Sequence, residues 1–197
     1  MGRVMNSFAV TVVVDGFDLD SEFQNAGIEC LTYEVVVSRT GGVTRVDAEI
    51  PALSPLDAVV QLQSDLRSIN VSVVRLDPDL VSVSEIAERC DVSRESARLW
   101  SAGKRRKGFP TPYTVVGSTP LWHWADVSSW LLSEGLEAGE SMPIPSSIVE
   151  ALNGTYTQLR NARREGWMLP TTAPVAHIGQ RLVRHSRGWH PVEAVSA

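Results

Sequence analysis

Residues 84–100 read SEIAERCDVSRESARLW, and this stretch decides the fold of the middle of the chain. Apolar residues recur at helical spacing on either side of a break: Ile86, Ala87 and Cys90 before it, Ala97 and Trp100 after it. Ser84 and Ser93 each stand where a helix would begin, because a serine hydroxyl accepts a hydrogen bond from a free N–H group of the first turn. The chain breaks at Asp91, and Val92 fills the space between the two segments. The spacing therefore predicts two short helices joined by a tight turn.

The second of these helices has a polar outer side. With Ala97 and Trp100 turned inward, the residues left facing outward are Arg94, Glu95, Ser96 and Arg98. Two short helices joined in this way are typical of a helix-turn-helix, whose second helix is shaped to enter the major groove of DNA. This is the only segment of the sequence whose spacing indicates a specific partner.

The residues that follow extend the pattern. Residues 104–107 are an unbroken basic run, KRRK, and the GFPTP sequence after it turns the chain. Two extended segments, 113–116 and 121–124, flank a turn at 117–120, and helical spacing resumes over residues 126–132. The predicted order is helix, turn, helix, basic loop, β-wing and helix.

Three stretches of this region resemble the winged helix-turn-helix of the MerR-like and excisionase-like DNA-binding proteins. They are SEIAERCDVSRESARLW, the GFPTP turn and WHWADVSSWL after the wing, and the resemblance covers residues 81–133, about a quarter of the chain. It implies that the second helix meets base edges and phosphates through Ser93, Arg94, Glu95, Ser96 and Arg98. It also implies that the basic loop and the wing tip meet the flanking DNA backbone through Lys104, Arg105, Arg106, Lys107, Ser118 and Thr119.

Two features depart from the family pattern. The wing tip at residues 117–119 carries no basic residue, whereas wings of this kind often carry arginine. Phosphates would repel Glu95 unless it reads cytosine N4 or pairs with Arg98 or Arg94. DNA affinity is therefore expected to depend on the basic run. Arg94 and Ser96, in the first turn of the helix, are expected to make the main base contacts, with Arg98 on phosphate or base.

The charge of the chain is unevenly distributed. The formal net charge is −5, but residues 1–80 hold 5 Lys and Arg against 12 Asp and Glu. Residues 81–135 hold 7 against 6, and residues 136–197 hold 6 against 5. A local basic patch governs phosphate contact more than the total charge does. The acidic N-terminal half is expected to lower non-specific DNA affinity without preventing binding.

The N-terminal half alternates between extended and helical patterns, with a hairpin turn at Gly41-Gly42. Predicted strands cover residues 8–14, 31–38, 43–50 and 71–76, and predicted helices cover residues 19–26 and a stretch that begins at Ser54-Pro55. The order β-α-β-β-α-β predicts a ferredoxin-like sandwich over residues 1–79, a four-stranded antiparallel sheet under two helices that serves dimerisation or sensing. The fold class is α+β.

The C-terminal third begins with a linker at residues 134–145. A helix is predicted over residues 146–165, with an apolar stripe that packs on a partner or on the winged region, 80–133. The basic end of this helix suits the helix dipole and could equally touch phosphate. Residues 166–197 lack sustained periodicity and are predicted to be a flexible tail.

The sequence carries no pattern typical of an enzyme or of a metal or cofactor site. The acidic residues around Asp15 lack the glycine and closing glutamate of an EF-hand, and the four histidines fit no zinc signature. His123, between two tryptophans of the wing, is expected to point outward. Cys30 and Cys90 are expected to be buried, reduced thiols of a cytoplasmic protein. No apolar run is long enough to span a bilayer, and no secretory signal is recognised.

The function predicted from these patterns is a sequence-specific, double-stranded DNA-binding transcriptional regulator, cytoplasmic and associated with the nucleoid. An excisionase-like architectural factor and a protein-interaction module with a degenerate winged domain are the alternatives. A homodimer is expected, because a single helix of this size buries too little surface for selective binding. Two surfaces are candidates for its interface: the face or edge of the N-terminal sheet around Val35, Val37, Val43 and Val46, and the stripe Ile148, Leu152, Tyr156 and Leu159. The sequence indicates no particular small-molecule effector.

Overall fold

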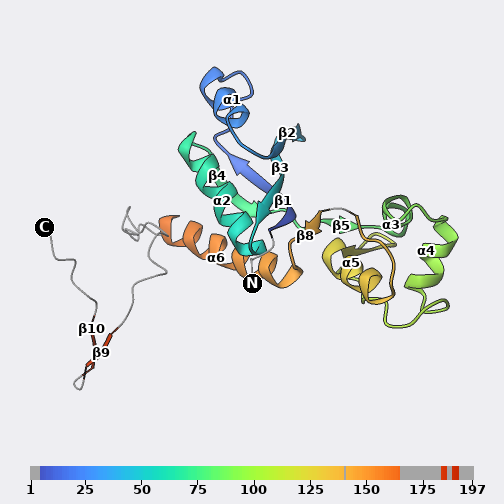
Figure 1. Cartoon of the computed structure of the whole chain (residues 1–197). Helices are drawn as coiled ribbons and strands as arrows, with labels where there is room; N and C mark the ends of the chain where they lie inside the picture. Colours follow the sequence, from blue (N-terminus) through green and yellow to red (C-terminus); the bar gives the residue numbers. More distant parts are fainter. Residues whose placement is uncertain (1–4, 140, 165–182, 186–187, 191–197) are drawn as a thin grey trace, which may run out of the picture. The chain divides into compact units, whose positions relative to one another are not determined.

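The computed structural model describes residues 5–139 and 141–164, together with the backbone of residues 183–185 and 188–190 (Figure 1). The chain divides into two compact units, residues 1–157 and 158–197, and its secondary structure is of the α+β class. In the second unit, β9 (Val183–His185) and β10 (Gly188–His190) pair in an antiparallel hairpin. The rest of the predicted tail, 166–197, lies outside the described residues.

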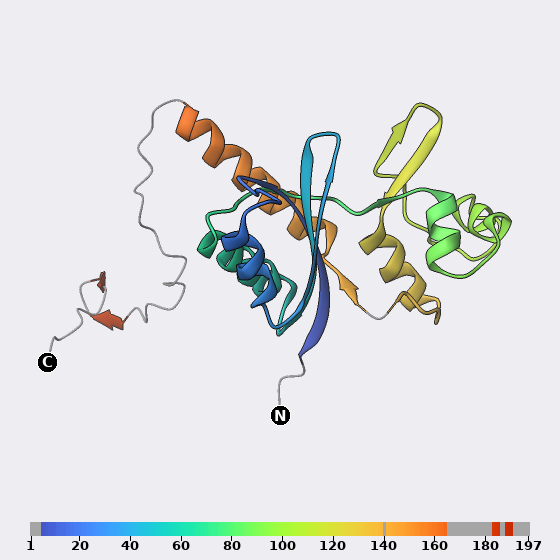
Figure 2. The same ribbon diagram turned by 90° about the horizontal axis from the view of Figure 1, so that it is seen from above.

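The N-terminal region of the first unit is a sheet with helices on one side (Figure 2). Its elements in chain order are β1 (Asn6–Asp15), α1 (Glu22–Glu29), β2 (Glu34–Thr40), β3 (Val43–Ala52), α2 (Pro55–Ser68) and β4 (Ser72–Leu76). The strand order is β2-β3-β1-β4, and each neighbouring pair is antiparallel. A short fifth strand, β8 (Met142–Pro143), pairs in parallel with β1.

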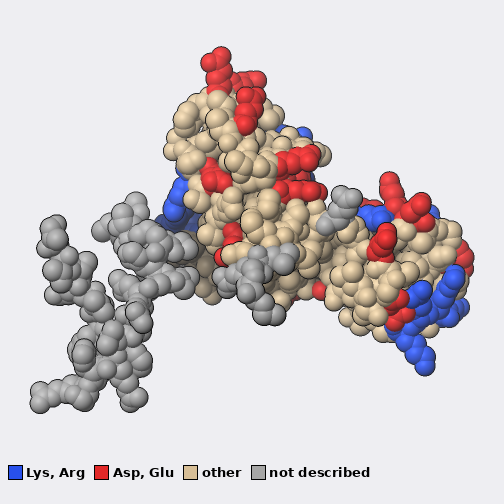
Figure 3. All heavy atoms as spheres, viewed as in Figure 1, with Lys and Arg blue, Asp and Glu red and all other residues tan. Residues whose placement is uncertain are grey.

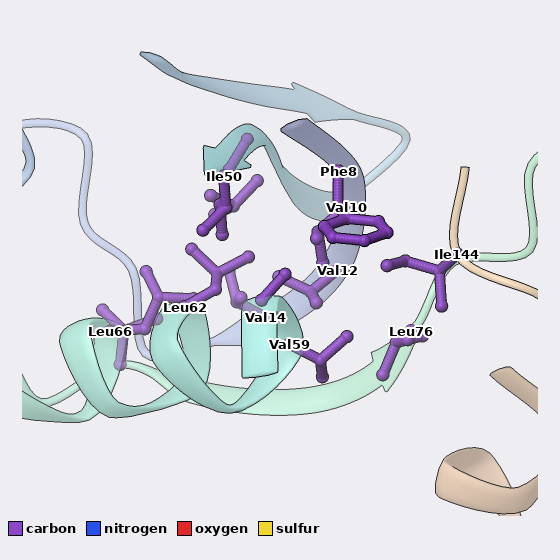
Figure 4. Close-up of a cluster of buried hydrophobic side chains, with 14 of the residues drawn as sticks. Phe8, Val10, Val12, Val14, Ile50, Val59, Leu62, Leu66, Leu76 and Ile144 are labelled. Carbon is purple, nitrogen blue, oxygen red and sulfur yellow. The ribbon is translucent and has the colours of Figure 1, made fainter. Parts of the chain in front are cut away.

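The core lies between the sheet and its helices (Figure 4). Alternate residues of β1 point into it, because successive side chains of a strand face opposite sides. Helix α2 begins where Ser54 Oγ accepts the N–H of Asp57, with Pro55 in the first turn. The largest fully buried side chains of this core are Val10, Val12, Val46, Ile50, Val59, Leu62, Leu66, Val71 and Leu76. Burying each of these side chains stabilises the fold by about 1.5–3 kcal/mol.

Helix α1 begins later than the 19–26 range predicted from the sequence. Ser21 is its N-cap and accepts the N–H of Gln24. The buried Gln24 side chain then donates to the carbonyls of Gly16 and Ile69, at 2.9 and 3.2 Å. A Cβ atom on Gly27 would lie 2.3 Å from Cγ2 of Ile69, so this glycine permits the close approach of α1 to the end of α2.

The C-terminal helix belongs to this core. Helix α6 (Ser146–Arg164) buries Val149 and Tyr156 in the same cluster of side chains. The Asn153 amide pairs with the backbone N–H and C=O of Leu76 at 2.8 and 3.0 Å. This helix therefore packs mainly on the N-terminal core, and it also contacts the winged region, where Ser146 Oγ donates a hydrogen bond to Asp126 at 2.8 Å. The predicted linker also contributes structure, because β8 and the buried Ile144 lie within it.

Most side chains of the first candidate dimer surface face the helices. Val35, Val37 and Val46 point toward the helices, and only Val43 of the predicted set stays outside that core. Of the second candidate set, Tyr156 is buried in the same core, and Ile148 and Leu152 pack against it. Both sets therefore mainly stabilise the N-terminal core.

The sheet face that carries no helix is polar. Thr11 donates a hydrogen bond to Asp47 across neighbouring strands at 2.7 Å. Asp77, just after β4, forms ion pairs with both Arg45 and Arg75. Burial alone would raise the pKa of the Asp77 carboxyl, but the two arginines outweigh this effect and hold its pKa below the usual range.

Residues 80–133 form a second core within the first unit. Its elements are β5 (Leu80–Val81), α3 (Val83–Arg89), α4 (Arg94–Ser101), β6 (Thr114–Val116), β7 (Thr119–His123) and α5 (Trp124–Ser133). The three strands form an antiparallel sheet in the order β5-β7-β6. The core they enclose with the helices contains Val81, Ile86, Ala87, Ala97, Trp100, Trp122, Trp124, Val127, Trp130 and Leu131.

Two boundaries in this region differ from the sequence expectation. Helix α3 is capped by Ser82, not Ser84, because Glu85 accepts the N–H of Ser82 while Ser82 Oγ accepts the N–H of Glu85. The wing turn is shorter than predicted, because Thr119 already belongs to β7. The second strand of the wing also ends one residue earlier than predicted, because α5 begins at Trp124. Among the described residues, no helix is long and apolar enough to cross a membrane.

Candidate nucleic-acid interface

The first turn of α4 presents an exposed arginine, Arg94. Ser93 caps the helix as predicted, accepting the N–H of Ser96 at 3.1 Å. The buried Ala97 and Trp100 fix the inner side of the helix, so Arg94 points outward. Arg94 is exposed and forms no ion pair with another described residue. Its guanidinium is therefore available to a ligand.

Ser96 is a weaker candidate for base contact than the sequence suggested. Its hydroxyl lies 2.9 Å from that of Ser93, and its side chain is half-buried. The hydroxyls of the two serines therefore bond to each other at the start of the helix. Of Arg94 and Ser96, the two residues expected to read bases, Arg94 is the more accessible.

Glu95 and Arg98 neutralise each other on the same helix. Nε and Nη2 of Arg98 donate to the two carboxylate oxygens of Glu95 at 2.7 and 2.6 Å. These hydrogen bonds lower the pKa of Glu95 and raise that of Arg98, although both side chains are open to solvent. The sequence left Arg94 and Arg98 as possible partners of Glu95, and in the structure Glu95 pairs with Arg98. The pairing holds the Arg98 guanidinium in one orientation over the outer side of α4.

The start of α3, the outer side of α4 and the wing turn line a shared groove of about 570 Å³. Its lining residues are Ser82, Val83, Ser84, Arg94, Glu95, Arg98, Ser118, Thr119 and Pro120. Gly117 supplies the positive φ of 62° that the tight wing turn requires. The groove therefore brings together five of the residues predicted from the sequence: Arg94, Glu95, Arg98, Ser118 and Thr119.

The basic loop begins at the end of α4. The backbone N–H groups of Lys104 and Arg105 both donate to the carbonyl of Leu99, at 3.0 and 3.1 Å. The side chains of Lys104, Arg105 and Lys107 are exposed and form no ion pair within the described region of the chain. Figure 3 shows Lys and Arg gathered on one side of this region, near the end of α4.

Arg106 has a different environment from its neighbours. It has a positive φ of 66° and donates to the backbone carbonyl and carboxylate of Glu134 at 3.0 and 3.1 Å. Its charge is therefore partly neutralised. Arg106 ties the loop to the end of α5, so the structure separates it from the three free cations of the run.

Two tryptophans hold this loop in place. Trp130 Nε1 donates to the carbonyl of Lys107, and Trp122 Nε1 donates to that of Pro110, both at 3.0 Å. The Phe109 ring packs edge-on against the indoles of Trp122 and Trp130, with ring centroids 5.7 and 4.8 Å away. The spacing of apolar residues in the sequence did not reveal these two donors. A buried indole N–H usually has a hydrogen-bond acceptor, so the tryptophans of this region were the one sequence feature that could have indicated such contacts.

The structure places His123 and Cys30 differently from the sequence expectation. His123 is buried rather than outward-facing, with its ring centroid 4.2 Å from that of Tyr113. Cys30 is exposed, whereas Cys90 is half-buried and burial raises the pKa of its thiol. The described residues contain no cluster of His, Cys, Asp and Glu that could hold a metal ion.

Arg89 joins the helical pair to the strands. Its guanidinium makes two hydrogen bonds to Asp79, at 2.6 and 2.8 Å, and lies 5.0 Å from the ring centroid of Trp124. This cation is therefore occupied inside the unit and is not offered to a ligand.

Comparisons of the chain with protein-family models, with curated proteins and with solved structures produce no match.

Proposed function

We propose that this protein is a sequence-specific, double-stranded DNA-binding regulator that uses residues 80–133 as a winged helix-turn-helix. The order of elements supports this: two helices joined at Asp91, whose φ is 48°, then a basic loop, a hairpin and a closing helix. The observation that carries the proposal is the Arg94 guanidinium, which forms no ion pair with a described residue. It lies in one groove with the wing turn, on the helix that leads into the exposed cations Lys104, Arg105 and Lys107.

In this proposal, α4 lies in the major groove and its first turn faces the base edges. Arg94 can make two hydrogen bonds to the O6 and N7 atoms of guanine, the commonest base contact of an arginine. The Glu95–Arg98 pair has no net charge, so it adds little attraction to phosphates. Its carboxylate can accept a hydrogen bond from cytosine N4 where that base lies opposite α4. Ser118 and Thr119 line the same groove and supply hydroxyls to the DNA backbone.

Phosphate binding is assigned to Lys104, Arg105 and Lys107. The loop is held by backbone hydrogen bonds to Leu99 and by the indole of Trp130, so little conformational entropy is lost when it meets DNA. Phosphate contacts release counterions, and the affinity should therefore fall steeply with salt.

The N-terminal region is proposed to be a ferredoxin-like sandwich that serves the winged region by dimerising or by sensing. The antiparallel strand order β2-β3-β1-β4, with α1 and α2 on one side, supports this assignment. Helix α6 and β8 complete its core.

The test is selection of genomic DNA fragments by the purified full-length protein, followed by affinity measurements on a recovered site. We expect recovered fragments to share a repeated sequence, and Arg94→Ala to weaken binding to it by about 1–3 kcal/mol while relaxing one base position. Arg67→Ala, an exposed arginine on α2, is the matched control and should leave binding unchanged. Featureless recovery with no salt-dependent DNA binding would favour a protein-interaction module, and bent DNA without a regulated promoter would favour an architectural factor.

A further inference from the structure

Arg106 occupies a backbone position that favours glycine. Its φ of 66° lies in the left-handed region, where the Cβ atom of any other residue is crowded, and the neighbouring positive values belong to Gly103 and Gly108. A residue stays in such a conformation only where surrounding contacts impose it, and residues of this kind gather at functional sites. The contacts of the Arg106 side chain therefore decide its role in the basic loop.

The Arg106 side chain binds the last turn of α5. Its Nη1 atom donates to the backbone carbonyl of Glu134 at 3.0 Å and to the carboxylate of the same residue at 3.1 Å. Glu134 is the C-cap of α5, where the carbonyls of the last turn carry partial negative charge and favour a nearby cation. The guanidinium of Arg106 is therefore occupied at the end of this helix.

The next residue of the loop is fixed to the same helix. The buried indole of Trp130 donates to the carbonyl of Lys107 at 3.0 Å. Trp130 and Glu134 are one helical turn apart, because the N–H of Glu134 donates to the carbonyl of Trp130 at 3.0 Å. Residues four apart lie on the same side of a helix. Arg106 and Lys107 are therefore anchored together on one side of α5.

Contacts at both ends hold the loop backbone in one conformation. At its start, the N–H groups of Lys104 and Arg105 donate to the carbonyl of Leu99 on α4. At its end, Arg106 and Lys107 are held by α5. The side chains of Lys104, Arg105 and Lys107 remain exposed. The loop therefore presents three cations from a backbone that is already ordered.

We propose that Arg106, Trp130 and Glu134 are positioning residues for phosphate binding by this loop. The inference rests on the proposed function, and it gives Arg106 a role other than the DNA contact expected from the sequence. Arg106 acts through its neighbours, because its contacts with α5 order the loop before DNA binds. Ordering a loop in advance removes a conformational cost of binding, and that cost does not depend on salt. The salt dependence is set by the cations that touch phosphate, so loss of an anchor should lower affinity and leave the salt slope unchanged.

Arg106→Lys tests the first anchor at constant charge. Lysine binds phosphate as a point charge, but its side chain is one bond shorter and lacks the guanidinium that reaches Glu134. In the full-length protein we expect faster cleavage within residues 104–107 by trypsin, which requires the loop to open. Binding to selected and random duplexes should weaken by about two- to tenfold with an unchanged salt slope. Arg67→Lys, the same exchange at an exposed arginine of α2, should leave both measurements at their native values.

Trp130→Phe removes the second anchor without changing charge. It keeps an aromatic ring in the core and loses the N–H donor to Lys107. Trp124→Phe is the matched control, because Trp124 is buried at the other end of α5 and its indole donates no hydrogen bond to a described residue. We expect Trp130→Phe to speed cleavage and weaken binding as Arg106→Lys does, and Trp124→Phe to do neither. Urea unfolding measures whether the two variants lose similar stability.

The outcomes separate this inference from the proposed function. A native protein that binds no DNA would refute the proposed function. Where the native protein binds DNA, an Arg106→Lys protein with native affinity or a native cleavage rate would overturn this inference alone. Equal losses of affinity in Trp130→Phe and Trp124→Phe would also overturn it, because core packing would then explain both.

Discussion

Replacing both Lys104 and Arg105 with glutamine should selectively remove sequence-independent DNA affinity. Their side chains are exposed and form no ion pair with a described residue, whereas their backbone N–H groups hold the loop to Leu99 in any variant. The fold should therefore lose no more than about 0.5 kcal/mol of stability. Glutamine keeps much of the side-chain length and removes the charge.

The magnitude follows from counterion release. Each phosphate contact contributes about 0.9 to the slope of log affinity against log salt concentration, so two lost contacts should reduce the slope by about 1.8. Between about 50 and 200 mM salt, the native protein should lose roughly 12-fold more affinity than the double variant. Fluorescence anisotropy with a selected duplex and a random duplex measures both slopes.

Two controls make this result interpretable. Arg67→Gln changes an exposed arginine on α2 and should leave the slope unchanged. Arg106→Gln removes a cation already occupied by Glu134, so its slope should change less than that of Lys104→Gln or Arg105→Gln alone. An unchanged slope in the double variant, with the native protein still bound to DNA, would refute the assignment of this loop to phosphate.

Four further substitutions have expected directions. Glu95→Gln releases Arg98 and removes a carboxylate from α4, so binding to random DNA should tighten on the order of threefold and selectivity should fall in a comparison of selected and random duplexes. Gly27→Ala should destabilise the protein by about 1–3 kcal/mol because its Cβ would overlap Ile69, whereas Gly154→Ala, in open space, should stabilise α6 by about 1 kcal/mol; urea unfolding measures both. Because the folded-state pKa of Asp77 is lowered, its stabilising effect is complete above the ordinary value of 3.8 and disappears as pH falls through the lower folded value. Asp77→Asn should therefore flatten the acid limb of a stability–pH profile; an unchanged limb would contradict this.

The sequence predicted the local patterns of the middle region well. The period of apolar residues identified α3 and α4, the break at Asp91 and the capping role of Ser93, because these depend on neighbours within a few residues. It misassigned the cap of α3, since Ser82 and Ser84 both precede the apolar positions and only the reciprocal hydrogen bond with Glu85 decides between them.

Long-range contacts could not be predicted in this way. Nothing local indicates that the Asn153 amide would bond to Leu76, or that β8 would join β1. For the same reason the sequence did not show which basic side chains of the loop form an ion pair within the chain. Residues 104–107 read as four equivalent charges, and the structure assigns Arg106 to Glu134.

The measurement that tests the central claim most directly is methylation interference on a selected duplex. Methylation of guanine N7 blocks the major-groove acceptor that an arginine reads. We predict that methylating one particular guanine in each half-site prevents binding by the native protein, and that Arg94→Ala becomes insensitive to methylation at that guanine while other positions keep their effect. If no guanine methylation interferes with binding, or if Arg94→Ala gives the native pattern, then α4 does not read DNA through the groove it shares with the wing turn.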